Sequence, residues 1–453
     1  MKKNSSILLV FLIAVSVGAK DLTSDQYRRN SLCFFFDSTI KGQVKYSSIM
    51  QKILSDYRMS DKFNDHNLGS MYVNIPKTYT QEEYNVAYPL KKQKSDNTWR
   101  SMYRSAVTPS SSDAEKKALK ALEKEWEYHD YEVECEAKAI HFAKSQNVAN
   151  LLIAKWFDAK EEKKDDSHYD VELIQARGAY NASELEKLRA NESQRGFAAL
   201  QDAGIELIPN TYVVITSFYV RDAETVMKES EGLDRDANMK TMFGLLGAVK
   251  TGRTENAYHG FLVEITTTFF KLNWDEQSEN LFINSYYNAP LEKLLNSKEF
   301  SLQELGRISE IGISYTLPGK DNSDENLLKV AIYEAIDKVI AAMQKKNEDF
   351  KIKSPVIDVT DKGVTAFIGL KEGLEKNSKF EVLQREYNES KNRFTYKKVG
   401  NLKIDKNNVW DNRLVIEGVQ MSKTDIKPNP NVDRTTLIGS GKFASGMLIR
   451  QTK

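Results

Sequence analysis

FLVEITTTFFKL, residues 261–272, is the stretch that decides the fold of the middle of the chain. Apolar and polar side chains alternate along it, which is typical of a β-strand with two different faces. One face holds Phe261, Val263, Ile265 and Phe269, and the other holds Glu264, Thr266 and Thr268. Residues 273–276, NWDE, indicate a turn, and residues 281–287 indicate a returning strand. We therefore predict an antiparallel hairpin with one apolar face and one solvated face.

The segments on either side of this hairpin predict an α/β domain over residues 204–347. Residues 211–220, TYVVITSFYV, are rich in β-branched and aromatic side chains and favour a strand. Residues 327–343 carry apolar side chains at helical spacing, and Ser323 precedes them as a capping residue. The hairpin and this helix complete the domain.

The preceding region, residues 20–203, reads as a mixed and mostly helical region. Residues 32–36, LCFFF, favour a buried strand. Helices are predicted, from capping residues, composition and apolar spacing, over residues 44–57, 114–128, 133–157 and 183–202.

The last region, residues 354–453, has a different pattern of short β-rich runs separated by turns. These runs cover residues 356–359, 364–368, 380–385, 394–399, 435–438 and 447–450. Several short strands in about a hundred residues favour a small β-barrel or a sandwich, and we expect the barrel. The fold class we predict is therefore α+β with several domains: a mixed N-terminal region, an α/β middle domain and a small C-terminal barrel.

The first nineteen residues have the pattern of a secretory signal peptide. Lys2 and Lys3 form a short positive segment, residues 7–17 are apolar, and Val17-Gly18-Ala19 offers small residues for cleavage. The apolar run is too short to span a bilayer. We expect an exported protein, located in the periplasm or associated with the outer membrane, with 434 residues after cleavage (453 minus 19).

Composition and cysteine content narrow the classes of partner. The chain has 65 Lys and Arg against 64 Asp and Glu, so no global charge attracts nucleic acid. Beyond Ala19 no apolar run approaches the roughly 20 residues of a membrane-spanning helix. Cys33 and Cys135, the two cysteines of the chain, can pair in an oxidising compartment or remain two separately buried thiols.

No motif in the sequence makes a convincing catalytic, cofactor or metal site. His129, Asp130, Glu134, Cys135 and His141 are close in sequence, but a third ligand converging with Glu134 and His141 is missing. Residues 321–326, DNSDEN, lack the glycine and the distal glutamate of a calcium loop and suit a helix cap. Residues 439–444, GSGKFA, depart from both phosphate-loop patterns and suit a turn near the last strand.

Two regions resemble known families. Residues 363–374, GVTAFIGLKEGL, with residues 379–382, KFEV, and 398–404, KVGNLKI, resemble the small β-barrel domain of flagellar assembly protein T. The middle region resembles the α/β domain of the curli secretion pore and of Tol-associated proteins, although this chain has no lipobox. The whole chain resembles exported envelope proteins of Gram-negative gut bacteria. These resemblances imply an envelope interaction module.

Three functions follow as hypotheses. The first is a non-enzymatic envelope protein that acts in assembly or as a structural interaction module, with envelope proteins or further copies of itself as partners. The second is a subunit of a curli-type outer-membrane pore, to which the interaction hairpin would contribute strands that meet lipid. The third is an exported hydrolase or a glycan-binding protein. The residues that we expect on the interaction hairpin are Phe261, Val263, Ile265, Phe269 and Trp274.

Overall fold

The computed structural model describes residues 31–57, 68–159, 169, 208–223, 225, 259–317, 320–347, 350–351, 353–388, 393–422 and 424–452. The predicted signal peptide and the helix predicted over residues 183–202 lie outside these residues. Within them the chain combines helices with two sheets, so the α+β class is correct.

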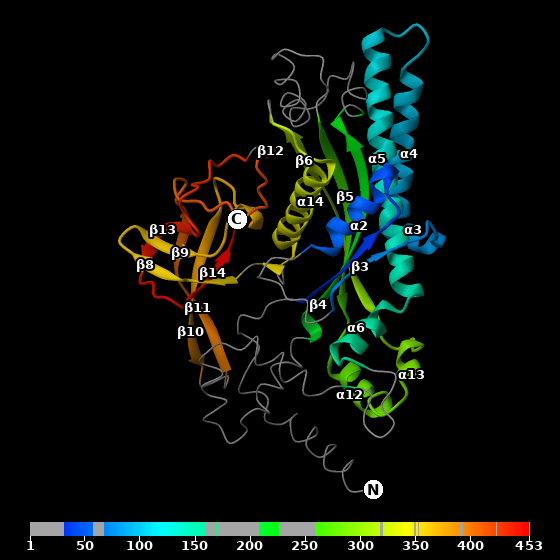
Figure 1. Cartoon of the computed structure of the whole chain (residues 1–453). Helices are drawn as coiled ribbons and strands as arrows, with labels where there is room; N and C mark the ends of the chain where they lie inside the picture. Colours follow the sequence, from blue (N-terminus) through cyan, green and yellow to red (C-terminus); the bar gives the residue numbers. More distant parts are fainter. Residues whose placement is uncertain are drawn as a thin grey trace.

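The first sheet is mixed, with parallel strands towards one end and antiparallel strands over the rest (Figure 1). Its strand order is β12 (Val419–Met421), β6 (Leu302–Thr316), β5 (Gly260–Leu272), β4 (Thr211–Asp222), β1 (Ser31–Asp37) and β3 (Ser70–Val73). Strand β1 runs parallel to both β3 and β4, whereas β5 is antiparallel to β4 and to β6. The short strand β2 (Lys41–Gly42) pairs with β4 beyond the end of β1.

Helices cover both faces of this sheet and give it two cores. On one face α14 (Asp324–Lys346) and α2 (Ser47–Ser55) pack on apolar side chains of β1, β4 and β5. On the other face lie α5 (Asp113–Ser145) and α6 (Val148–Trp156), with α12 (Glu276–Ser285) and α13 (Leu291–Leu295) at one end. Helices α3 (Gln81–Ala87) and α4 (Leu90–Ala106) lead into α5, and α4 and α5 form a helical arm beside the sheet (Figure 1).

One sheet takes strands from both of the regions that we separated near residue 204. Strand β1 comes from the N-terminal region and pairs with β4 of the middle region from Ser31↔Thr211 to Phe36↔Thr216. Strand β12 from the C-terminal region adds to β6 at the edge of the same sheet. The predicted boundary at residue 204 therefore falls within one sheet, because the parallel partner of β1 is remote in sequence.

The predicted hairpin needs a correction. Strand β5 is present, but residues 281–287, predicted as the returning strand, lie largely in helix α12, which begins after Asp275. The Asp275 carboxylate accepts a hydrogen bond from Ser278 N at 2.8 Å and caps the helix, and the antiparallel partners of β5 are β4 and β6 instead. The pore hypothesis relied on this hairpin.

The face of β5 that we predicted to be solvated is also buried. Glu264, Thr266 and Thr268 are between 1% and 6% exposed. Helix α5 covers this face, and Arg221 of β4 forms an ion pair with Glu264. The alternation was read correctly as two faces, but a polar face inside a protein can be satisfied by partners other than water.

The C-terminal region forms a second, antiparallel sheet. Its strand order is β7 (Lys353–Pro355), β14 (Leu448–Gln451), β10 (Lys379–Asn388), β11 (Arg393–Ile404), β13 (Thr435–Gly441), β9 (Gly363–Ala366) and β8 (Asp358–Thr360). An apolar cluster that includes Val364, Phe380, Leu402 and Leu437 forms its own core. We call this region the C-terminal module. It contacts the part of the chain built on the first sheet where its short helix η6 (Leu370–Glu372) packs on α14.

Helix α5 is one continuous helix where we predicted two. Residues 129–132 continue it without a break, and a capping box of Ser112 and Glu115 begins it. Among the described residues, none of the helices combines the length and the hydrophobicity of a membrane-spanning segment.

Candidate functional site

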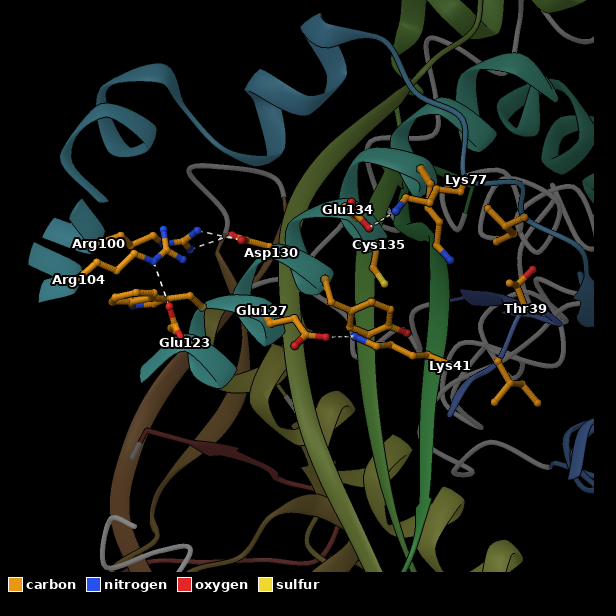
Figure 2. A pocket seen from close by; sticks show the side chains of 15 residues that line it. Thr39, Lys41, Lys77, Arg100, Arg104, Glu123, Glu127, Asp130, Glu134 and Cys135 are labelled. Atoms are coloured by element: carbon orange, nitrogen blue, oxygen red, sulfur yellow. Dashed lines mark hydrogen bonds and ion pairs between the residues drawn. The ribbon is translucent and has the colours of Figure 1, made fainter. Parts of the chain in front are cut away.

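A cleft of about 550 Å³ opens between α4, α5 and the ends of β1 and β3 (Figure 2). Residues 39–41 line it just beyond β1, and Ile75 and Lys77 line it just beyond β3. The remaining walls come from α4 and from one face of α5. The cleft therefore lies at the carboxyl ends of two parallel strands.

The topology explains why a cleft forms at this edge. After β1 the chain passes through α2 on one face of the sheet to reach β3, and after β3 it passes through α5 and α6 on the other face to reach β4. The connections that follow the neighbouring strands β1 and β3 therefore run over opposite faces of the sheet. Open sheets with parallel strands bind their ligands at such a point, outside the carboxyl ends of the strands.

Asp37, the last residue of β1, is fully buried at the base of the cleft. Both oxygens of its carboxylate have polar partners. Its Oδ1 accepts hydrogen bonds from Thr39 N at 2.9 Å and Ile75 N at 3.3 Å. Its Oδ2 accepts a hydrogen bond from Ser217 Oγ at 3.2 Å and forms an ion pair with Lys138 Nζ of α5. Asp37 therefore joins β1, β4, α5 and the segment after β3.

The inner wall of the cleft combines a cation with aromatic rings. Lys41 Nζ lies 4.4 Å from the ring centroid of Tyr131 and 4.9 Å from that of Tyr219. The same ammonium group lies 3.7 Å from a carboxylate oxygen of Glu127. Burial raises the pKa of Tyr131, whose hydroxyl donates a hydrogen bond to Phe218 O at 3.3 Å, so this hydroxyl is neutral at physiological pH.

The outer wall is built from two arginines of α4 above Trp126 of α5. Arg100 donates two hydrogen bonds of 2.8 Å to the Asp130 carboxylate, and Arg104 Nε donates one of 3.1 Å to Glu123. Both guanidinium carbons lie over the Trp126 ring, at 5.6 and 5.2 Å from its centroid. Burial opposes the charge on Asp130, but the bonds from Arg100 hold the pKa of this carboxyl below its usual value.

A single stripe of carboxylates on α5 supplies most of the partners. Its members are Glu123, Glu127, Asp130 and Glu134, spaced by four, three and four residues, and Glu134 pairs with Lys77 at 2.8 Å. This spacing places all of them on one side of the helix. The sequence contains this signal, which we missed because we treated residues 114–128 and 133–157 as separate helices.

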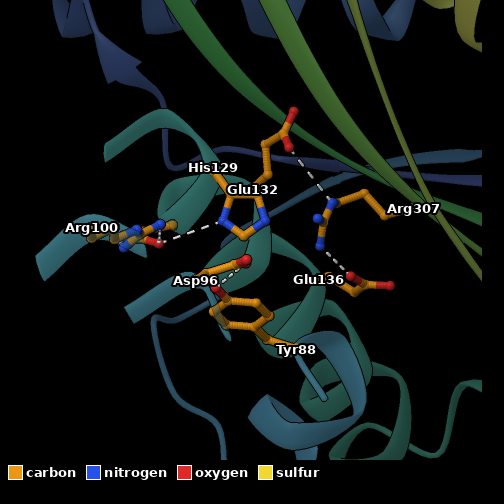
Figure 3. A network of polar contacts seen from close by, with 8 residues as sticks. Tyr88, Asp96, Arg100, His129, Glu132, Glu136 and Arg307 are labelled. Atoms are coloured by element: carbon orange, nitrogen blue, oxygen red, sulfur yellow. Dashed lines mark hydrogen bonds and ion pairs between the residues drawn. The ribbon is translucent and has the colours of Figure 1, made fainter. Parts of the chain in front are cut away.

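A second polar network lies behind this wall (Figure 3). His129 Nδ1 lies 3.5 Å from Asp130, and Tyr88 donates a hydrogen bond to Asp96 at 2.6 Å. Arg307 of β6 forms ion pairs with Glu132 and Glu136 of α5. Burial, opposed by Arg307 and assisted by Glu304, raises the pKa of Glu136 to about 7.

The two cysteines are free thiols, and both are buried. The Cys33 thiol donates to Leu68 O at 3.7 Å, whereas Cys135 lines the cleft. Burial raises the pKa of the Cys135 thiol even though Lys138 is near it, so the thiol is neutral. Cys135 lies near Asp37. Asp37 is four residues from Cys33 along β1, a separation of about 13 Å, so the two cysteines lie near opposite ends of this strand.

The other residues that we singled out are structural. Phe261, Val263, Ile265 and Phe269 belong to the core beneath α14, and Trp274 belongs to the core beneath α6. His141 lies 3.0 Å from Glu83, whereas Glu134 belongs to the cleft described above, where it pairs with Lys77. Ser323 Oγ accepts a hydrogen bond from Asn326 N and caps α14, and residues 439–441 lie within β13 instead of a turn.

The described part of the chain holds no group of three or more His, Cys, Asp or Glu side chains arranged to bind a metal ion. What the cleft presents is a set of ion pairs beside aromatic rings. No protein-family model matches the chain, and no curated protein is significantly similar to it.

Proposed function

We propose that this chain is a non-enzymatic protein of the bacterial envelope and that the cleft beside α5 recognises a charged segment of a partner protein. The observation that carries the proposal is the charge pairing in the cleft. Among the described residues that line it, the five cations Lys41, Lys77, Arg100, Arg104 and Lys138 are each paired with a carboxylate.

Because its charged side chains are paired, the cleft suits a binding role better than a catalytic role. A general acid or base must exchange its proton with a substrate, and a nucleophile needs a base beside it. Here the carboxylates are bound to cations, and the Cys135 thiol has a raised pKa. A peptide that carries both signs of charge can replace one partner of the exposed pairs of Lys41, Lys77 and Arg104, and Trp126 and Tyr131 offer apolar contact.

The C-terminal sheet supports the role of an interaction module. We propose that it acts as the small barrel-like module that its resemblance to flagellar assembly protein T implies. Its edge strand β8 is exposed along all three residues, and such an edge can accept a further strand from a partner.

The location in the envelope is tested by fractionation of native cells, with carbonate and then detergent extraction of the membrane pellet. We expect recovery in the periplasm or release by carbonate, as for an exported peripheral protein. Recovery with the cytoplasmic fraction would contradict the proposal.

The recognition role is tested by reversing a charge at the mouth of the cleft. The Glu127 side chain is 76% exposed, so Glu127→Lys leaves the fold intact while it reverses a charge beside Lys41. Glu417→Lys is the matched control, because Glu417 is 90% exposed and lies outside the cleft. After chemical crosslinking in cells, we expect Glu127→Lys to lower the yield of a complex with an envelope protein about tenfold. Equal yields for the two variants would contradict a role for the cleft.

A further inference from the structure

Helix α4 exposes large apolar side chains although it packs against α5. None of its residues is buried. Trp99 and Met102 are each 56% exposed and Tyr103 is 48% exposed. The rings of Trp99 and Tyr103 lie 6.3 Å apart, and the spacing of the three residues places them on one side of the helix.

This side of α4 points away from its partner helix. Arg100 and Arg104 hold α4 on α5 through Asp130 and Glu123. Trp99 and Tyr103 each precede one of these arginines, so they are rotated by about 100° around the helix axis from the contact. The aromatic side chains are thus left on the outer surface of the arm.

The charge on α4 is biased towards positive. Arg100 and Arg104 are paired with carboxylates of α5, so the rest of the helix carries Lys91, Lys92 and Lys94 against Asp96, a net charge of +2 (three minus one), whereas the whole chain is at +1. The Asp96 carboxylate accepts a hydrogen bond from the Tyr88 hydroxyl. Lys91, Lys92 and Lys94 are exposed. We call Lys91, Lys92, Trp99, Met102 and Tyr103 the α4 face.

We infer that the α4 face lies on the surface of a bilayer that contains anionic phospholipid. Lysine ammonium groups near such a surface are attracted to its anionic phosphate headgroups. Tryptophan and tyrosine rings partition into the boundary between headgroups and acyl chains. A protein partner would need carboxylates placed to match these lysines, whereas an anionic bilayer offers negative charge without a fixed pattern.

The inference rests on the proposed envelope location, because it requires an anionic bilayer within reach. It does not depend on the cleft. Fractionation of cells tests the location, and binding to purified vesicles tests the α4 face, so the two can fail separately.

The test is flotation of the purified full chain with vesicles of phosphatidylcholine alone or with phosphatidylglycerol at three parts in ten. We expect at least tenfold more protein bound to the anionic vesicles, with binding reduced by salt. Trp99→Ala with Tyr103→Ala, and separately Lys91→Gln with Lys92→Gln, should each lower binding about tenfold. All four residues are at least partly exposed, so these variants should keep the circular dichroism spectrum of the parent.

Matched controls lie on the C-terminal module and beside it. Phe367→Ala removes an aromatic ring that is 47% exposed, and Lys320→Gln removes an exposed cation. Both should bind like the parent chain. The inference would be overturned if the parent chain bound no vesicles or bound neutral vesicles equally well. It would also be overturned if the control variants lost as much binding as the α4 variants. It would also be overturned if the α4 variants abolished a dimer in sedimentation experiments without changing vesicle binding, since the face would then dock a second copy.

Discussion

Lys138 of α5 forms a buried ion pair with Asp37, the last residue of β1. The side chain of Lys138 is 9% exposed and that of Asp37 is fully buried. The pair fixes α5, the longest of the described helices, above the carboxyl end of β1, the strand that lies between the parallel strands β3 and β4. It also sets the floor of the cleft, because Lys138 and Cys135 both line it.

Removal of one partner of this pair should be costly. Lys138→Met leaves the Asp37 carboxylate buried without its cation, and such losses cost about 3–5 kcal/mol. We expect a decrease of this size in the free energy of unfolding, measured by urea denaturation. The double variant Asp37→Asn with Lys138→Met should recover part of the loss. A change below about 1 kcal/mol in Lys138→Met would contradict the role assigned to the pair.

Asp337 of α14 should make stability depend on pH. Burial, opposed by Lys371 of η6 at 3.6 Å, raises the pKa of Asp337 from 3.8 to about 7. The native state therefore holds a proton that the unfolded chain has lost, so the free energy of unfolding falls as the pH rises from about 4 to 7.

Asp337→Asn removes this contribution. Each pKa unit corresponds to about 1.4 kcal/mol, so between pH 5 and pH 8 the variant should gain about 2–3 kcal/mol relative to the parent chain. Urea denaturation at several pH values measures this difference, with the exposed Glu417→Gln as control. A difference that does not change with pH would contradict the predicted titration.

Gly312 of β6 should tolerate no side chain. A Cβ atom there would lie 1.8 Å from Ala331 O and 2.9 Å from Ala335 N of α14. Gly312→Ala must push α14 away from the sheet, which costs about 1–3 kcal/mol or more. Thermal unfolding should show a lower Tm. An unchanged Tm would mean that α14 does not touch the sheet at this residue.

The two thiols should be protected in the folded protein. Because Cys33 and Cys135 are buried and free, a thiol reagent should modify neither in buffer and both in denaturant. Mass spectrometry without a reductant should show two unmodified thiols. A mass lower by two hydrogens would contradict the free state of both cysteines.

Local patterns predicted several elements, and long-range pairing set the rest. The strand over residues 211–220 and the helix over residues 327–343 carry strong periodic signals, and both are present. The prediction of a returning strand over residues 281–287 was wrong, because Asp275 caps helix α12 and this helix takes up residues 276–285. The prediction that one face of β5 is solvated was wrong. Arg221 of the neighbouring strand forms an ion pair with the buried Glu264, and spacing along the chain does not reveal this pairing.

The candidate site was only partly accessible to sequence reasoning. The carboxylates of α5 share one face of the helix and could have been found from their spacing. Their cations come from α4 and from the segments after β1 and β3. The neighbours of these segments depend on the parallel pairing of β1 with β3 and β4, and no local pattern in the chain specifies that pairing.

The most direct test of the central claim is a photoreactive amino acid placed in the cleft of the protein in living cells. Lys77, with a side chain that is 69% exposed, is the position in the cleft, and Lys320, 55% exposed, is the matched position outside it. On irradiation we predict a crosslink from position 77, but not from position 320, to one envelope protein. A cytoplasmic partner, the same products from both positions, or no product from position 77 would contradict recognition at the cleft.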